Sequence, residues 1–249
     1  MASPAYDADP IALLKALLAT IEEHIIPLTS QGVFSGNKLF GAAILTKDGL
    51  IPQTVATNNE TASPLLHGEI HCIQQFFAQT TFPAPALSSS SPAAVSLEGG
   101  FGRPSPQDCV FLATHEPCSL CLSGITWSGF DNFFYLFTYE DSRDLFSIPY
   151  DIDILQEVFR VPAVPASSGA QDAGVGEDLD ARPLYNRRNK FFTARSFEDL
   201  VREIKEKHGE EEGGRWGEEV RRVKAMYNGL SDTYQRSKTG AVESASFWK

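Results

Sequence analysis

Two stretches of sequence decide how this chain folds: LLHGEIHCI at residues 65–73 and ATHEPCSLC at residues 113–121. Each places metal-ligating side chains at the predicted start of a helix, His67 in the first stretch and Cys118 and Cys121 in the second. One histidine and two cysteines form a ligand set that Zn²⁺ uses in catalytic sites, where a fourth position stays open for water. The positive end of a helix also favours the thiolate that binds metal. We therefore predict one zinc site built from these three residues.

Glu69 follows the predicted histidine ligand by two positions, in the pattern His67-Gly68-Glu69. A carboxylate there lies near the metal without binding it, and it can move protons between water and a substrate. Each half of the pattern is weak alone, because C-x-x-C also occurs in redox sites and H-x-E is common. Together, each at a helix start, they favour zinc. His71 lacks the H-E-x-x-H order of a metalloprotease, and we predict an ordinary helix position for it.

The segments around the two stretches alternate between helical and strand patterns. Apolar residues at helical spacing follow Asp9-Pro10, and Pro27 is expected to end that helix. Residues 40–46 and 51–57 flank an Asp-Gly turn signal and predict a β-hairpin. Helices are expected at 67–79, 119–128 and 151–159, and buried strands at 110–114 and 133–138. This order predicts a three-layer α/β/α domain with a mixed central sheet.

Composition divides the chain into three parts. Residues 1–162 form the predicted catalytic domain, and a surface insertion rich in Pro, Ser and Gly interrupts it at 80–108. Residues 163–182 are the expected linker, and residues 183–249 the expected helical C-terminal extension. Its predicted helices, 197–207 and 216–234, are separated by a glycine-containing stretch at 209–214. Its aromatic side chains predict that it packs against the catalytic domain or a second subunit.

The net charge of −11 is unevenly distributed. Residues 1–182 carry 7 Lys or Arg against 21 Asp or Glu, whereas residues 183–249 carry 14 against 11. An acidic catalytic region argues against nucleic acid as the substrate, because nucleic-acid affinity depends on cationic contacts. No apolar run is long enough for a membrane span, and the N-terminus lacks a secretory signal pattern. Four cysteines are too few for a disulfide scaffold, so we expect a cytoplasmic protein, with the nucleus as the alternative.

The two motifs match the H-x-E and P-C-x-x-C signature of zinc deaminases. From residue 11 to residue 159 the chain resembles the cytidine-deaminase-like superfamily. HGEI is similar to the motif of yeast cytosine deaminase, whereas THEPCSLC resembles the motif of guanine and tRNA adenosine deaminases. The TYED of residues 138–141 resembles a stretch that follows the same strand in bacterial guanine deaminases. The resemblance implies the cytidine-deaminase-like fold, a Zn²⁺ cofactor, a homodimer, and Glu69 as the residue that moves protons.

The same resemblance assigns contacts to the substrate. An asparagine before the histidine motif is expected to bind the base, and both Asn58 and Asn59 are candidates. Asp141 is expected near a guanine pocket, with a helix cap as the alternative. The full set of expected substrate-binding residues is Phe40, Gly41, Asn58, Asn59, Gly68 and Asp141.

We therefore expect a zinc-dependent aminohydrolase that converts a small guanine- or cytosine-type heterocycle to its oxo form and releases ammonia, with guanine favoured. One alternative is a tRNA adenosine deaminase subunit, whose Arg187, Arg188 and Lys190 would contact RNA. A second alternative is a catalytically silent deaminase-like partner protein. The presence of Glu69 argues against the silent partner.

Overall fold

The computed structural model describes residues 5–78, 103–161 and 182–238. Within these ranges the strands form one sheet in the order β2-β1-β3-β4-β5. β1 pairs antiparallel with β2 and β3, whereas β4 is parallel to both β3 and β5. The sheet is therefore mixed, as predicted. The strands are β1 (Gly41–Thr46), β2 (Pro52–Thr57), β3 (Cys109–His115), β4 (Asn132–Phe137) and β5 (Thr193–Ser196).

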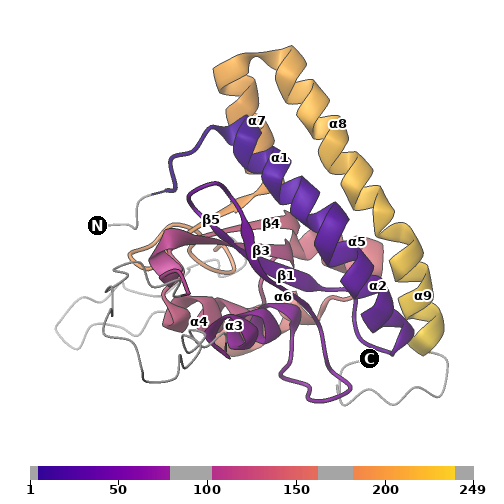
Figure 1. Cartoon of the computed structure of the whole chain (residues 1–249). Helices are drawn as coiled ribbons and strands as arrows, with labels where there is room; N and C mark the ends of the chain where they lie inside the picture. Colours follow the sequence, from indigo (N-terminus) through magenta and orange to yellow (C-terminus); the bar gives the residue numbers. More distant parts are fainter. Residues whose placement is uncertain (1–4, 79–102, 162–181, 239–249) are drawn as a thin grey trace, which may run out of the picture.

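Helices cover both faces of the sheet, which confirms the three-layer prediction (Figure 1). Ala43 and Leu45 of β1 belong to the apolar cluster on one face, and Ala42 and Ile44 to the cluster on the other. The first face is covered by α1 (Pro10–Thr20), α2 (Ile26–Phe34), α7 (Phe197–His208), α8 (Glu210–Met226) and α9 (Asn228–Lys238). The second is covered by α3 (Gly68–Ala78) and α4 (Ser119–Ser128).

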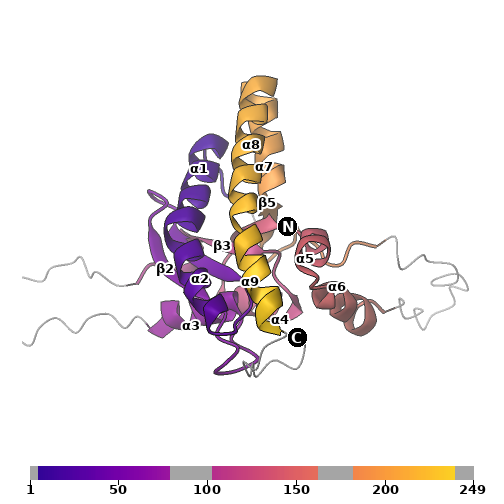
Figure 2. The same ribbon diagram turned by 90° about the vertical axis from the view of Figure 1, so that its right-hand side faces the viewer.

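The helices that follow β4 lie to one side of these layers, as Figure 2 shows. They are α5 (Tyr139–Phe146), α6 (Tyr150–Ile154) and the π-helical turn η3 (Leu155–Phe159). A short 3₁₀ turn, η2 (Pro106–Asp108), leads into β3. Most of the predicted insertion and nearly all of the predicted linker lie outside the described residues. In the described part of the chain, no helix is both long and apolar enough to span a membrane.

The prediction that Pro27 ends the first helix is wrong. After α1 the chain widens into a π-helical turn, η1 (Ile21–Ile25), in which the Ile26 N–H donates to the Ile21 carbonyl five residues earlier. α2 then continues with Pro27 in its first turn. A proline inside an α-helix lacks the N–H and clashes with the carbonyl four residues before it. The wider π turn changes that local pairing, and the helical path continues.

The C-terminal extension is helical and packs into the same core as the catalytic domain. Leu200, Val223 and Tyr227 are fully buried in one cluster with Leu13 and Leu17 of α1. This confirms that the extension docks on the catalytic domain. The extension also supplies a strand, β5, which the sequence patterns did not reveal.

The predicted interruption at residues 209–214 is shorter than expected. Only Gly209, with φ 95°, separates α7 from α8, and Gly213 lies within α8. A Cβ at Gly213 would lie 2.6 Å from the Cβ of Lys205 on α7. This glycine therefore permits the close approach of two helices and does not end either of them.

His115, the last residue of β3, lies buried in an aromatic cluster. Its ring centroid is 4.1 Å from that of Phe40 and 4.8 Å from that of Phe137, and Tyr227 of the extension contacts it edge-on. Nδ1 lies 2.9 Å from the Thr114 hydroxyl, and among the described residues Nε2 has no hydrogen-bond partner. Burial, with a smaller contribution from the charge of Lys224, holds the pKa of His115 well below its ordinary value.

Acidification should therefore destabilise the fold through His115. Below about pH 6.5 this histidine binds a proton in the unfolded chain but stays neutral in the folded chain. The free energy of unfolding therefore falls by up to about 1.4 kcal/mol per pH unit until the pH reaches the pKa of the folded state. His115→Phe removes the group and should flatten this slope in urea unfolding series. His24→Gln, which removes an exposed histidine, is the matched control. An unchanged slope in His115→Phe would contradict the assignment.

Candidate metal centre and active site

The starts of α3 and α4 bring the three predicted metal ligands together. Cys118 Sγ lies 3.4 Å and Cys121 Sγ 3.7 Å from His67 Nδ1, and all three ligand atoms lie within 4.8 Å of one another. Zinc bonds of about 2.0 Å to nitrogen and 2.3 Å to sulfur, at a tetrahedral angle, place two ligand atoms about 3.6 Å apart. The donor set and its spacing therefore fit Zn²⁺.

Close packing of two glycines positions the histidine. A Cβ added at Gly68 would lie 3.0 Å from the Gly41 Cα, and one added at Gly41 would lie 2.5 Å from the Ile25 side chain. A side chain at Gly68 would push α3 away from the start of β1, and one at Gly41 would collide with Ile25 of η1. Gly41 and Gly68, predicted to contact substrate, thus have a packing role that brings His67 to the site.

The ligand side chains share protons when no metal is present. Burial lowers the pKa of His67, but the hydrogen bond and charge of Cys118 outweigh it and raise this pKa to about 9. A hydrogen bond from the Cys121 thiol holds the pKa of Cys118 well below its ordinary value, and burial raises that of Cys121. Zinc binds histidine and cysteine in their deprotonated forms, so metal binding would displace protons from these side chains.

Glu69 lies beside these metal ligands, on the first turn of α3. It is only 5% exposed, and its carboxylate accepts a hydrogen bond from the Cys121 thiol. Burial, together with the nearby Cys118 thiolate, raises the pKa of Glu69 to about 7. A carboxylate with such a pKa can both accept and donate a proton near neutral pH.

The loop before α3 distinguishes the two candidate asparagines. Asn58 is buried, its Oδ1 accepts from the Gly68 N–H at 2.5 Å, and among the described residues its Nδ2 has no partner. Asn59 instead shapes the loop, because its N–H donates to the Leu66 carbonyl and its Oδ1 accepts from Thr61. The geometry favours Asn58 as the residue with a donor available to a ligand.

A buried ion pair holds this loop in place, and no sequence motif signalled it. Lys38 Nζ lies 3.0 Å from Glu60 Oε1, with the Glu60 side chain 1% exposed, and the Lys38 N–H donates to the other oxygen.

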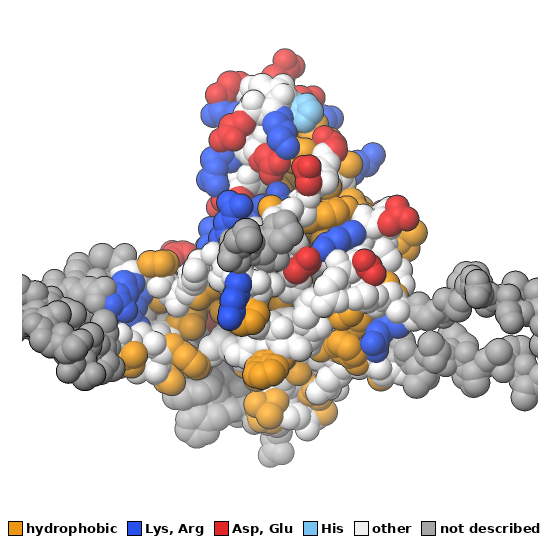
Figure 3. All heavy atoms as spheres, turned by 90° about the vertical axis from the view of Figure 1, so that its left-hand side faces the viewer, with side chains coloured by type: hydrophobic (Ala, Val, Ile, Leu, Met, Phe, Trp, Pro, Cys, Tyr) orange, Lys and Arg blue, Asp and Glu red, His pale blue; other side chains and the backbone are white. Residues whose placement is uncertain are grey.

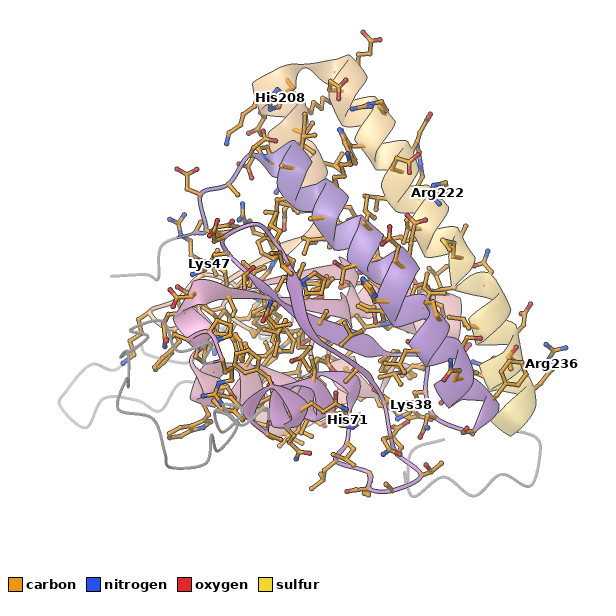
Figure 4. The ribbon with its side chains drawn as sticks, in the orientation of Figure 1. Lys38, Lys47, His71, His208, Arg222 and Arg236 are labelled. Atoms are coloured by element: carbon orange, nitrogen blue, oxygen red, sulfur yellow. The ribbon has the colours of Figure 1, made fainter. Side chains whose placement is uncertain are left out.

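His71 is directed away from the metal ligands: Nδ1 bonds to the Thr57 carbonyl and Nε2 to Gln75. Figure 4 shows His71 and Lys38 at the lower edge of the molecule.

Two further predicted contacts, Phe40 and Asp141, have other partners. The Phe40 ring packs on His115, and only its backbone approaches Gly68. Asp141 completes a capping box with Thr138 at the start of α5, and it lies 2.8 Å from Lys224 Nζ. These contacts correspond to the helix-cap alternative for Asp141.

Sequence patterns missed a second carboxylate near the metal ligands, Asp151 on α6. Burial raises its pKa to about 7, and the Cys118 thiolate and Glu69 add to that rise. These effects place Asp151 within electrostatic reach of the metal site. It follows Cys121 by thirty residues in an acidic stretch, YDID, that gives no sign of which carboxylate is used.

Glu116 joins the cysteine motif to the C-terminal part of the chain. It is buried, and its carboxylate accepts from the Tyr139 N–H at 3.2 Å and from the Tyr185 hydroxyl at 2.8 Å. The Tyr139 hydroxyl in turn donates to the Pro117 carbonyl. The turn carrying Cys118 is thereby fixed by residues that follow it in the chain.

Residues 25–137 match the family model of the cytidine and deoxycytidylate deaminase zinc-binding region. This range includes all three metal ligands and Glu69. The chain therefore carries a zinc-binding deaminase domain at these residues, with His67, Cys118 and Cys121 placed to hold the metal. Comparison with curated protein sequences gives no match.

Several solved structures are similar to this chain. Guanine deaminase from Nitrosomonas europaea is 15% identical, with 80% of this chain and 81% of that chain covered and a TM-score of 0.39. Guanine deaminase from Bacillus subtilis is 23% identical, with 65% and 88% covered and a TM-score of 0.39. A structure from a study of tRNA:A34 deaminases is 14% identical, with 48% and 72% covered and a TM-score of 0.33.

Proposed function

We propose that this protein is a hydrolytic deaminase that converts an amino-substituted nucleobase, guanine in preference to cytosine, to its oxo form. The observation that carries the proposal is the buried carboxylate of Glu69 beside three converging zinc ligands. A site serving only structure needs no such group, and structural zinc sites are usually closed by four protein ligands. The described residues here supply a cluster of three.

Zinc, when bound by His67, Cys118 and Cys121, supplies Lewis acidity that lowers the pKa of water toward about 7. Glu69 takes the proton from the attacking water and passes it to a ring nitrogen of the base. The same carboxylate then takes the second proton from the hydroxyl that now stands on the base and gives it to the departing amino group, which leaves as ammonia while the carbonyl forms. Burial raises the pKa of Glu69 and so favours its uptake of the proton from water.

The side chains of Asn58 and Asp151 favour a base that offers a carbonyl acceptor beside N–H donors. The free Nδ2 of Asn58 can donate to a carbonyl oxygen, and the Asp151 carboxylate can accept from ring and amino N–H groups. Guanine offers a carbonyl beside an N–H and an amino group. Cytosine offers a ring acceptor between its carbonyl and its amino group, so a carboxylate suits guanine better.

Asp151→Asn should lower kcat/KM for the preferred base while zinc content stays at wild-type level. A hydrogen bond to a charged group is worth about 1.5–3 kcal/mol, which corresponds to a loss of about 10- to 150-fold. Steady-state kinetics with metal analysis measure both quantities. Asp153→Asn, an exposed change on the same helix, is the control. Equal kcat/KM in the two variants would remove Asp151 from the site.

The charge distribution supports a small-molecule substrate. Figure 3 shows basic and acidic side chains interspersed over the tip of α7 and α8, so neither sign forms a continuous patch on that face. A polynucleotide substrate requires several cationic contacts, and its turnover would fall steeply with added salt. We infer a free base or nucleoside, handled by a homodimer in the cytoplasm.

The deciding assay measures ammonia released from guanine, cytosine, adenosine and tRNA by the zinc-loaded protein. Turnover of guanine that changes little between low and physiological ionic strength supports the proposal. Efficient deamination of tRNA with no turnover of any free base or nucleoside would overturn it. Absence of turnover on every substrate, with zinc bound, would instead favour the silent partner protein.

A further inference from the structure

The turn that carries Cys118 is held by residues outside it. Cys118 precedes the first residue of α4, and its side chain makes no capping hydrogen bond to that helix. Instead, the Glu116 N–H donates to the Phe137 carbonyl at 2.8 Å, and the Tyr139 hydroxyl donates to the Pro117 carbonyl. The position of this metal ligand therefore depends on the partners of the two residues before it.

Tyr185 is a partner that the C-terminal part of the chain supplies to this turn. Its hydroxyl donates to Glu116 Oε1 at 2.8 Å, across 69 residues of sequence. Glu116 is only 7% exposed, and the Tyr139 N–H and the Tyr135 hydroxyl bond to the same carboxyl group. Tyr135 and Tyr139 belong to β4 and α5, whereas Tyr185 follows the predicted linker. One buried carboxyl group thus connects the metal-binding turn to the C-terminal part.

The Tyr185 ring is held in place by contacts that do not involve its hydroxyl. The ring packs against the apolar cluster that α3 and α4 cover, and it meets the Tyr139 ring edge-on with 6.2 Å between the centroids. Two residues later, the Arg187 carbonyl accepts from the Ala194 N–H of β5. Phenylalanine at position 185 would keep the ring contacts and lose only the bond to Glu116.

We propose that Tyr185 is a positioning residue of the zinc centre, acting through Glu116 on the turn that carries Cys118. Metal affinity depends on the groups that orient the ligands, and loss of such a group typically weakens binding about 10- to 100-fold. Tyr185 acts through a neighbour of the ligand and not on the ligand itself, so we expect the lower end of this range. The inference rests on the metal site and is independent of which base the protein deaminates.

The test is the zinc affinity of Tyr185→Phe in the full chain, measured by competition with a chromophoric chelator. We expect binding about tenfold weaker than in the wild type. The Co²⁺-loaded protein gives a second readout, because the visible absorption bands of Co²⁺ report the geometry of its ligands, and these bands should shift. A role confined to stability would lower the free energy of unfolding and leave the bands in place.

Tyr6→Phe is the matched control. The Tyr6 hydroxyl also donates from a half-buried ring, to the Lys47 carbonyl, but this ring packs on the apolar cluster of the other face of the sheet. The control should bind both metals as the wild type does. A weaker zinc affinity or shifted Co²⁺ bands in Tyr185→Phe, absent from Tyr6→Phe, supports the assignment. Wild-type affinity and bands in Tyr185→Phe, or equal changes in the two variants, overturn it.

The double variant Glu116→Ala/Tyr185→Phe tests the route through the carboxyl group. Alanine removes the acceptor, so Tyr185→Phe should weaken zinc binding no further in the Glu116→Ala background. A further loss of about tenfold there would overturn the proposal. If the alanine variants do not fold, the comparison of Tyr185→Phe with Tyr6→Phe decides alone. None of these measurements needs a substrate, so a failure of every base in the ammonia assay would leave the inference standing.

Discussion

Glu69→Gln should abolish nearly all turnover while the protein keeps its fold and about one zinc per chain. Glutamine has the size of glutamate, but its amide cannot take a proton from water. A general acid–base group is worth about 10²–10⁴ in rate, and Glu69 is proposed to serve more than one transfer. The loss should appear in kcat, because the substrate contacts assigned to Asn58 and Asp151 are unchanged.

Glu60→Gln provides the control for this experiment. Glu60 is a buried carboxylate in the loop before α3, paired with Lys38, and it has no role in the proposed proton transfers. Its replacement should cost stability more than catalytic rate. If Glu69→Gln retains more than about a tenth of wild-type kcat, a loss well below that expected for a general acid–base group, another residue moves the protons.

Cys118→Ser should lose zinc. The serine hydroxyl does not ionise near neutral pH, so the site falls to two ligands, and two ligands hold Zn²⁺ far more weakly than three. Zinc per chain, measured after dialysis against a mild chelator, should drop from about one to near zero. Thermal stability should drop with it, because metal binding to the folded state contributes to stability.

Cys109→Ser is the matched control. Cys109 is a fully buried thiol at the start of β3, whereas Cys118 follows the other end of that strand, so its loss should leave the zinc content unchanged. His67→Ala should repeat the result of Cys118→Ser through the third ligand. Full zinc occupancy in both ligand variants would show that other residues hold the metal.

Sequence patterns predicted the elements that depend on local signals. The hairpin of β1 and β2 follows from two strand-forming stretches around the Asp48-Gly49 turn signal, and the end of α4 follows from Gly129, whose φ of 83° suits glycine. The zinc ligands were predictable because chemistry restricts both their types and their spacing. Their convergence at the starts of α3 and α4 follows from the same signals.

Features that depend on distant partners could not be predicted in this way. β5 is a four-residue strand whose sequence, TARS, lacks an apolar pattern, and its pairing with β4 alone defines it. The pKa of Asp151 is raised by its burial beside the metal ligands, which local sequence does not show. In each case tertiary contacts outweigh local preference.

The position of β5 at the end of the sheet constrains the order in which the chain can fold during synthesis. β4 ends at Phe137, but its outer edge is paired only once residues 193–196 have emerged. The ligands on α3 and α4 emerge earlier, so the metal centre can assemble while one edge of the sheet and the apolar face awaiting α7–α9 are still open. Open edges and faces invite association between nascent chains. A fragment that ends at residue 162 would keep the open edge of β4 and the uncovered apolar face permanently. A stable fragment must therefore extend through α9.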